Sequence, residues 1–348
     1  MNGATAERSA LVDALFPAGI PNLWCPLLTH YRADGTIDTE RISAHIRHMR
    51  PLIPAFLAPG STGDGWEMTQ DEADILLEFL LREAVRQDFS VMVGVLRTEP
   101  GTVVPAIDTF LRTHTAGTAP ADATALAGQR VCGFTVTPPR GAALPQLTIH
   151  TELEAIAATG APLAIYQLPQ ITENEMSPDT VADLATRFPN VYLMKDTSGR
   201  DVVAQSGVDL DNLFLVRGAE GDYARWSRYS GGPYDGFLLS TTNCFAAELG
   251  KMLGLLQEGR RDEAEAISER VTAVSGELLG AAGELPFGNP FANGNKAIDH
   301  HYAWGPAADT AEPPMTHSGE RLPRSLVDKA RDALRRNGLD VGGGYMNR

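Results

Sequence analysis

Lys195 stands where a buried strand is predicted to end. Residues 191–194 form a short apolar run between a Pro-Asn breaker and a Ser-Gly turn, which is the pattern of a strand entering a loop. An unpaired ammonium is costly to bury, so this lysine must be paired, solvated at the strand tip or kept partly neutral for chemistry. An ion pair with Asp196 or another carboxylate is the structural alternative.

Tyr166 ends the preceding strand, which we predict at residues 163–166. Neighbouring strands run roughly 4.8 Å apart, so a phenol and an amine at adjacent tips suit Schiff-base chemistry. A neutral amine attacks a ketone, and a nearby acid or base removes water from the carbinolamine. The protonated imine then draws electrons from the neighbouring carbon–carbon bond. This permits aldol cleavage or, with a leaving group on the next carbon, dehydration.

A loop of small residues, Gly60-Ser61-Thr62-Gly63, follows another predicted strand. Its amides and two hydroxyls form a potential receptor for a carboxylate, although a plain turn is the alternative. Other substrate contacts are expected after the predicted strands at 134–137, 213–216 and 236–240. They are Arg140, Arg217, Gly218 and Thr241. Each arginine could equally pair with a neighbouring carboxylate.

The elements that must position these residues alternate regularly. Eight apolar runs predict strands near residues 22–29, 55–58, 91–96, 134–137, 163–166, 191–194, 213–216 and 236–240. Amphipathic segments between them predict helices, one of which begins with a capping box at Thr69 and Glu72. This α/β pattern predicts a (β/α)8 barrel, with the strand ends on the catalytic face. A doubly wound sheet is disfavoured because the turn at residues 29–32 contains no glycine.

The chain is expected to divide at about residue 262. Residues 1–262 comprise the barrel, an N-terminal helix and a surface insertion at 113–130 that takes no part in catalysis. Residues 263–348 form a C-terminal helical extension with a flexible glycine-rich tail at 342–344.

Composition narrows the function classes for this chain of 348 residues. A net charge of −15 argues against a nucleic-acid surface or an anionic membrane as partner. No signal peptide or membrane-spanning run is evident, and the three cysteines have no disulfide or zinc spacing, so we expect a cytoplasmic protein with free buried thiols. The pairs His45/His48 and His300/His301 are predicted on helices away from the strand ends, so no catalytic metal is expected.

The strand-end motifs recur together in one known family. They are Gly60-Ser61-Thr62-Gly63-Asp64, Tyr166-x-x-Pro169, Lys195-Asp196-x-Ser198-Gly199 and Gly236-x-x-x-Ser240-x-x-Asn243. Over about residues 20–300 the chain resembles the dihydrodipicolinate synthase/N-acetylneuraminate lyase family of Schiff-base lyases. The resemblance implies Lys195 as nucleophile, Tyr166 as proton relay, and Ser61 and Thr62 as the carboxylate site of a 2-oxo acid. Thr62 is also assigned a catalytic role.

The chain departs from the family pattern at several positions. The tyrosine that family members carry after strand four is replaced by Arg140, and the arginine that follows Tyr-x-x-Pro in the synthases is replaced by Ile171. Lysine-pathway synthase activity is therefore not expected. Trp66, at the mouth of the Ser-Thr loop, could line a pocket for an apolar aldehyde or simply pack at the surface.

These observations predict a lyase that makes or breaks a carbon–carbon bond of a pyruvate-type 2-oxo acid, with or without an aldehyde co-substrate. It would use no organic cofactor and no metal, and the family resemblance implies a homo-oligomer, a dimer or tetramer. The alternatives are a dehydratase of a 2-oxo sugar acid acting through the same imine, and a non-catalytic barrel that binds 2-oxo acids.

Overall fold

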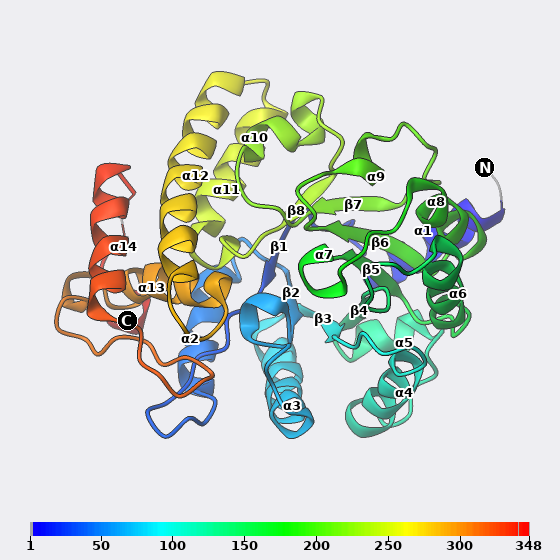
Figure 1. Cartoon of the computed structure of the whole chain (residues 1–348), viewed down its shortest axis with the longest axis horizontal. Coiled ribbons are helices and arrows are strands. Elements are labelled where there is room, and N and C mark those ends of the chain that lie inside the picture. Colours follow the sequence, from blue (N-terminus) through cyan, green and yellow to red (C-terminus); the bar gives the residue numbers. More distant parts are fainter. Residues whose placement is uncertain (1–2, 340, 348) are drawn as a thin grey trace. The chain divides into compact units, whose positions relative to one another are not determined.

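The computed structural model describes residues 3–339 and 341–347. Eight parallel strands close into a barrel in chain order, surrounded by helices and followed by a C-terminal helical region (Figure 1). The predicted (β/α)8 class is therefore confirmed. The strands are β1 (Leu23–Pro26), β2 (Ala55–Ala58), β3 (Ser90–Val95), β4 (Val131–Val136), β5 (Leu163–Gln167), β6 (Val191–Asp196), β7 (Phe214–Arg217) and β8 (Gly236–Leu238).

The chain groups into two compact units. The first contains Met1–Asn22, Leu80–Ala219 and Pro233–Leu238, and the second contains Leu23–Phe79, Glu220–Gly232 and Leu239–Arg348. Helix α3 (Gln70–Gln87) begins in the second unit and ends in the first.

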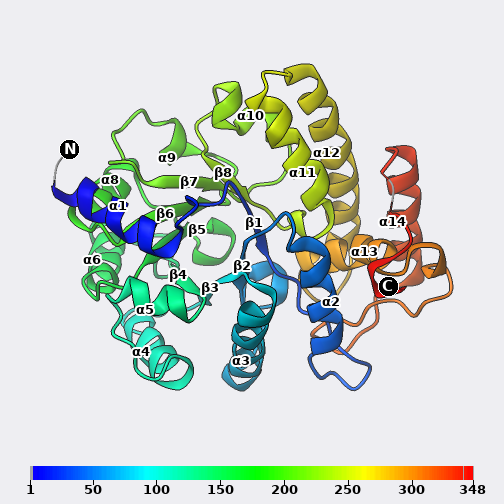
Figure 2. The ribbon, with the colours of Figure 1, turned by 180° about the vertical axis from the view of Figure 1, so that it is seen from behind.

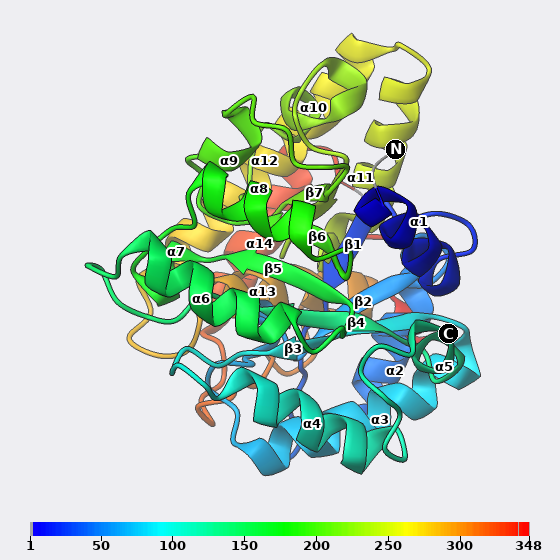
Figure 3. The ribbon, with the colours of Figure 1, turned by 90° about the vertical axis from the view of Figure 1, so that its right-hand side faces the viewer.

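The first unit carries β3 to β8, and Figure 3 shows β5, β6 and β7 side by side. These strands are buried, which explains their nearly continuous apolar runs. Its helices are α1 (Gly3–Leu15), α4 (Val103–His114), α5 (Ala123–Gly128), α6 (Gln146–Ala157), α7 (Pro169–Thr172), α8 (Pro178–Arg187) and α9 (Val202–Gln205). Helix α5 lies within the predicted insertion at 113–130 and packs against α1 (Figure 2).

The second unit carries β1, β2 and the C-terminal helices. Helix α12 lies beside α11, and α13 packs against α11, α12 and α14 (Figure 2). The helices are α2 (Thr39–Met49), α10 (Tyr223–Trp226), α11 (Thr242–Gln257), α12 (Arg261–Gly283), α13 (Pro290–Trp304) and α14 (Arg324–Arg336), with short 3-10 turns η1 (Ser61–Gly63), η2 (Arg228–Ser230), η3 (Gly305–Ala307) and η4 (Tyr345–Asn347).

Several local predictions are tested by this arrangement. The capping box is confirmed, because Thr69 N donates to Glu72 Oε2 at 2.8 Å and Glu72 N donates to Thr69 Oγ1 at 3.3 Å. All three cysteines are buried free thiols. Among the described helices, none is both long and apolar enough to cross a membrane.

The flexible tail at 342–344 stays a prediction, and the residues that follow it are packed at Tyr345. Tyr345 is buried, its hydroxyl donates to both oxygens of Asp299 at 2.9 Å, and its ring stacks on His48. Tyr345 thus supplies apolar area and hydrogen bonds that anchor the chain after the glycines.

The environment of His300, on α13, leads us to expect that the free energy of unfolding falls at acidic pH. Its Nε2 donates to the Ala308 carbonyl at 2.8 Å, while its buried Nδ1 has no hydrogen-bond partner among the described residues. Burial lowers the pKa of His300 from 6.5 to about 4, because a proton on Nδ1 would be neither solvated nor accepted. Between these values the unfolded chain binds a proton that the folded chain does not, so acidification favours unfolding.

We therefore expect His300→Gln, which keeps a donor for Ala308, to flatten the pH profile of stability. From this residue alone the wild type should lose about 1.4 kcal/mol of unfolding free energy per pH unit below 6.5, and above 6.5 the contribution should be constant. Urea unfolding between about pH 7.5 and about pH 4.5 measures the difference. Parallel profiles for the two proteins would contradict this assignment.

Candidate active site

Lys195 and Tyr166 lie opposite each other in the register of β6 and β5. Lys195 is only 4% exposed, and its Nζ lies over the Tyr166 ring, 4.0 Å from the ring centroid. Within its own unit, no described carboxylate forms an ion pair with Lys195. The structural alternative, a pair with Asp196, is not what the structure shows. An ammonium held over an aromatic face is stabilised without a counter-charge.

Thr197 and Gly218 complete the surroundings of this lysine. Thr197 Oγ1 donates a long hydrogen bond of 3.5 Å to Tyr166 Oη. A Cβ on Gly218 would overlap the Thr197 hydroxyl and lie 2.9 Å from Lys195 Cε, so only glycine allows β7 to approach so closely. Thr197 was missed in the sequence, although its position two residues after the lysine at a strand end is a usable signal.

Asp196 faces a different group of polar residues. Its Oδ1 accepts from the Ser198 amide at 2.8 Å, and the Tyr234 hydroxyl lies 3.3 Å from Oδ2. Burial raises the pKa of Asp196, opposed in part by the hydrogen bonds from Ser198. The Tyr234 hydroxyl also donates to Asp201 at 2.6 Å, so this carboxylate pair is joined through a phenol.

Both candidate substrate arginines are engaged by carboxylates. Arg217 bonds both oxygens of Asp201, at 2.9 and 3.1 Å, and donates to the Ala219 carbonyl. Arg140 pairs with Glu173 and so joins the loops after β4 and β5. Substrate binding by either guanidinium would require it to share or leave its carboxylate. In each case the ion-pair alternative describes the structure.

In the second unit, the Ser61–Thr62 loop folds as η1 directly after β2. The Gly63 and Gly65 amides donate to the Gly60 carbonyl, whereas no described acceptor takes the amides of Ser61 and Thr62. Gly63 must lack a Cβ, which would overlap the Leu27 carbonyl oxygen. The loop therefore presents two amides and two hydroxyls, which suits a carboxylate.

Two side chains of the α13 region hold this loop in place. Asn289, at the N-cap of the helix, donates from Nδ2 to the Ser61 carbonyl at 2.8 Å. Lys296 is fully buried, and its Nζ lies 2.8 Å from Asp64 Oδ2, where Asp64 ends η1 in the left-handed conformation. The chain thus contains two buried lysines in opposite circumstances: Lys296 pairs with a carboxylate of its unit and Lys195 does not.

The residues after β7 and β8 form a network around Glu220, which the sequence did not single out. Glu220 accepts from Ser240 Oγ at 2.6 Å, from the Thr241 amide and hydroxyl at 3.1 and 2.7 Å, and from the Tyr223 hydroxyl at 2.8 Å. Asn295 of α13 donates in turn to Ser240 Oγ. The expected substrate contact at Thr241 is thus a fully buried side chain whose hydroxyl is bound to Glu220.

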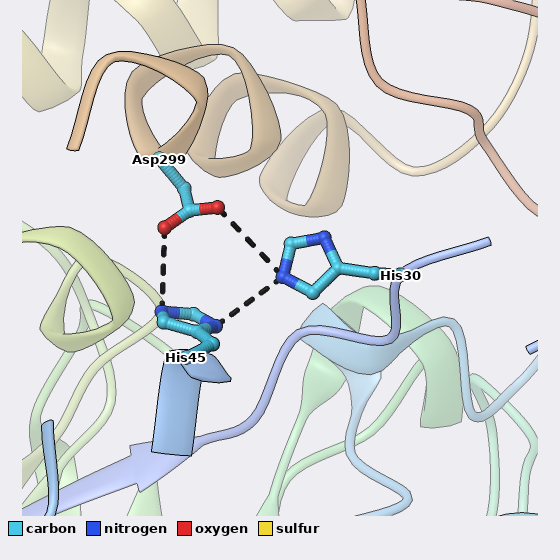
Figure 4. Close-up of side chains that lie close together, drawn as sticks. All are labelled: His30, His45 and Asp299. Carbon is cyan, nitrogen blue, oxygen red and sulfur yellow. Dashed lines mark hydrogen bonds and ion pairs between the residues drawn. The ribbon is translucent and has the colours of Figure 1, made fainter. Parts of the chain in front are cut away.

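His30, His45 and Asp299 converge in the second unit and could in principle hold a metal (Figure 4). His45 Nε2 donates to the Asn243 carbonyl at 2.8 Å, so its Nδ1 is left to accept from His30 Nε2 at 3.3 Å. Arg41 donates to Asp299 at 2.7 Å.

Burial and the Arg41 guanidinium together shift the pKa values of Asp299 and the two histidines. Burial alone would raise the pKa of Asp299, but the neighbouring histidines and the Arg41 guanidinium lower it overall. Burial lowers the pKa of both histidines. A metal ion would compete with Arg41 for the same carboxylate. The geometry therefore favours a buried ion pair flanked by neutral imidazoles over a metal centre.

Known proteins match this chain at low identity. The model of the dihydrodipicolinate synthetase family matches residues 136–286. The 4-hydroxy-tetrahydrodipicolinate synthase of Sulfurihydrogenibium sp. (strain YO3AOP1) is 26% identical over 69% of this chain and 76% of its own.

Solved structures share the fold. Dihydrodipicolinate synthase from Aquifex aeolicus has a TM-score of 0.66 and 16% identity, covering 93% of this chain and 100% of its own. The 2-keto 3-deoxygluconate aldolase from Picrophilus torridus has a TM-score of 0.61 and 21% identity, covering 79% and 91%.

The (β/α)8 barrel of this chain is the fold that these solved structures share. The chain therefore resembles the dihydrodipicolinate synthetase family at low identity, and the match to the family model lies within residues 136–286. Members of this family are class I lyases, which supports an enzyme of this general kind.

Proposed function

We propose that this chain is a Schiff-base lyase that makes or breaks a carbon–carbon bond of a pyruvate-type 2-oxo acid. The observation that carries the proposal is Lys195, which is buried at a strand end beside Tyr166 without an ion-pair partner in its own unit. An amine at a strand end beside a phenol is placed to attack a ketone while the phenol serves as acid and base.

In the proposed reaction, Lys195 Nζ attacks the ketone carbon of the acid to form a carbinolamine. Tyr166 donates a proton to the departing hydroxyl, water leaves, and an iminium ion remains on Lys195. Tyr166, which has given up its proton, then takes the proton of the hydroxyl on the fourth carbon. The electrons of the bond between the third and fourth carbons move toward the iminium, which gives an enamine and releases an aldehyde. Protonation of the enamine and hydrolysis of the imine by water return pyruvate and the free amine. Thr197 bonds the Tyr166 hydroxyl and would help to orient its proton.

We assign binding of the substrate carboxylate to the loop from Gly60 to Gly63. The assignment is supported by the amides and the hydroxyl protons of Ser61 and Thr62, which no described acceptor of the second unit takes. Thr62 is further proposed to relay protons. In a (β/α)8 barrel the loops after the strands share the catalytic face. We propose that Gly218 contributes by leaving space for the Lys195 side chain, which a Cβ at this position would occupy.

Ile171 supports an activity other than lysine-pathway synthesis. At this position on α7 the chain offers no cation for a second carboxylate. Homo-oligomerisation remains part of the proposal, on the family resemblance.

Borohydride trapping tests the proposal directly. The chain has four lysines, of which Lys251 and Lys329 are exposed and Lys195 and Lys296 are buried, so an adduct is readily mapped. We expect reduction in the presence of pyruvate to add one pyruvate-derived group at Lys195, as detected by intact mass and peptide mapping. An adduct with longer 2-oxo acids but not with pyruvate would favour the dehydratase. No adduct with any of a panel of 2-oxo acids would overturn the enzyme proposal in favour of a binding protein.

A further inference from the structure

Trp66 lies five residues beyond Ser61, in the second unit, and its indole reaches back to the loop. Trp66 Nε1 donates to Ser61 Oγ at 2.9 Å. Between them the chain reverses direction at Asp64, whose φ of 61° is left-handed. The Glu67 and Met68 amides both donate to the Asp64 carbonyl, which holds Trp66 in a closed turn.

The direction of this hydrogen bond is unambiguous. An indole N–H is only a donor, whereas a serine hydroxyl has one proton and two acceptor lone pairs. Trp66 therefore occupies an acceptor position of Ser61 Oγ and leaves the Ser61 proton to be donated elsewhere. No acceptor among the described residues is bonded to that proton, and the same holds for the hydroxyl of Thr62.

The backbone beneath the serine is already fixed. Asn289 holds the Ser61 carbonyl, Lys296 holds Asp64, and Thr29 Oγ1 donates to the Gly63 carbonyl at 2.8 Å. The remaining freedom of Ser61 is rotation about its side-chain bonds, which includes the hydroxyl rotor. The contact with Trp66 restricts that freedom.

We propose that Trp66 is a positioning residue that presents the Ser61 hydroxyl as a donor to the carboxylate of the substrate. A serine hydroxyl that rotates freely offers a lone pair as readily as a proton, and a lone pair repels an anion. With one of its two lone pairs taken by the indole N–H, the Ser61 hydroxyl favours ligands that accept hydrogen bonds, such as carboxylates, over neutral groups that donate them. This inference rests on the proposed assignment of the loop to carboxylate binding.

A double-mutant cycle tests the inference, with wild type compared to Trp66→Phe, Ser61→Ala and the double variant. Phenylalanine keeps an aromatic ring but removes the N–H. The affinity for pyruvate is measured by titration, and borohydride trapping at Lys195 is measured separately. We expect Trp66→Phe to weaken pyruvate binding about three- to tenfold, as for the loss of one hydrogen bond, with trapping at saturation retained. In the Ser61→Ala background the same change should have no effect, because Trp66 acts through Ser61.

Tryptophan fluorescence reports whether pyruvate binds next to Trp66, which a purely structural role of this residue would not produce. Pyruvate should alter the Trp66 emission in the wild type, and that response should be absent in Trp66→Phe and reduced in Ser61→Ala. Trp226→Phe, which removes another half-buried indole of the same unit, is the matched control and should bind pyruvate like the wild type.

The outcomes separate this inference from the proposed function. Additive effects of the two substitutions, or unchanged affinity in Trp66→Phe, would overturn the role of Trp66 while an adduct at Lys195 still supports the lyase. Coupled losses of affinity without any adduct would support Trp66 and overturn the Schiff base. Absence of binding by any 2-oxo acid would overturn both.

Discussion

Lys195→Arg is expected to reduce turnover of the trapped 2-oxo acid by about 10⁴-fold or more, because the proposed reaction has no other nucleophile. Arginine keeps a positive charge over the Tyr166 ring, so that the local electrostatics change little. Its guanidinium stays protonated at all practical pH values and cannot attack a ketone. The borohydride adduct should disappear together with turnover.

Kinetics and mass spectrometry on one preparation would check this result. Thermal unfolding establishes that the barrel is intact, and circular dichroism should match the wild type. Lys251→Arg, at an exposed position on α11, is the matched control and should leave turnover unchanged. Turnover within tenfold of the wild type in a folded Lys195→Arg protein would refute the nucleophile assignment.

Lys296→Met is expected to lower the free energy of unfolding by about 3–5 kcal/mol. The substitution removes the ammonium that lies 2.8 Å from Asp64, a carboxylate that is only 3% exposed. A buried charge without its partner costs far more than the pair itself contributes, since solvation was already lost when the protein folded. The contact of Lys296 with the face of Tyr31 is lost as well.

The double variant Asp64→Asn/Lys296→Met distinguishes this explanation from a packing defect. With the carboxylate neutralised, most of the lost stability should return, since a buried neutral pair carries no uncompensated charge. Urea unfolding at neutral pH measures all three proteins, with exposed Lys329→Met as the control. A single variant that loses less than about 1 kcal/mol would contradict the account.

Lys296 also illustrates how a C-terminal helix shapes a loop near the start of the chain. Asn289 and Lys296 of α13 hold Ser61 and Asp64, and Asn295 of the same helix holds Ser240. The helical extension is therefore part of the architecture of two strand-end loops. We expect Lys296→Met to disturb the Ser61 loop even where the protein remains folded.

Much of the fold could be predicted from local patterns. The alternation of apolar runs and amphipathic segments predicted eight parallel strands, since short apolar runs between turn residues differ from longer amphipathic helices in length and pattern. The capping box at Thr69 and the position of Lys195 near the end of β6 depend on residues close in sequence. The pairing of Tyr166 with Lys195 followed from two consecutive parallel strands, whose ends must lie together.

Partners distant in the chain were decided only by tertiary structure. Arg217 was predicted to face substrate, but the left-handed Asp201 turns a carboxylate onto it. Thr241 is bound to Glu220, and His30 and His45 meet Asp299 across more than 250 residues of sequence. A buried polar group needs a hydrogen-bond partner, and the fold decides which residue supplies it. The local sequence pattern does not predict that partner. The sequence by itself determined which residues end the strands, whereas the packed structure decided which of their charges remain available for chemistry.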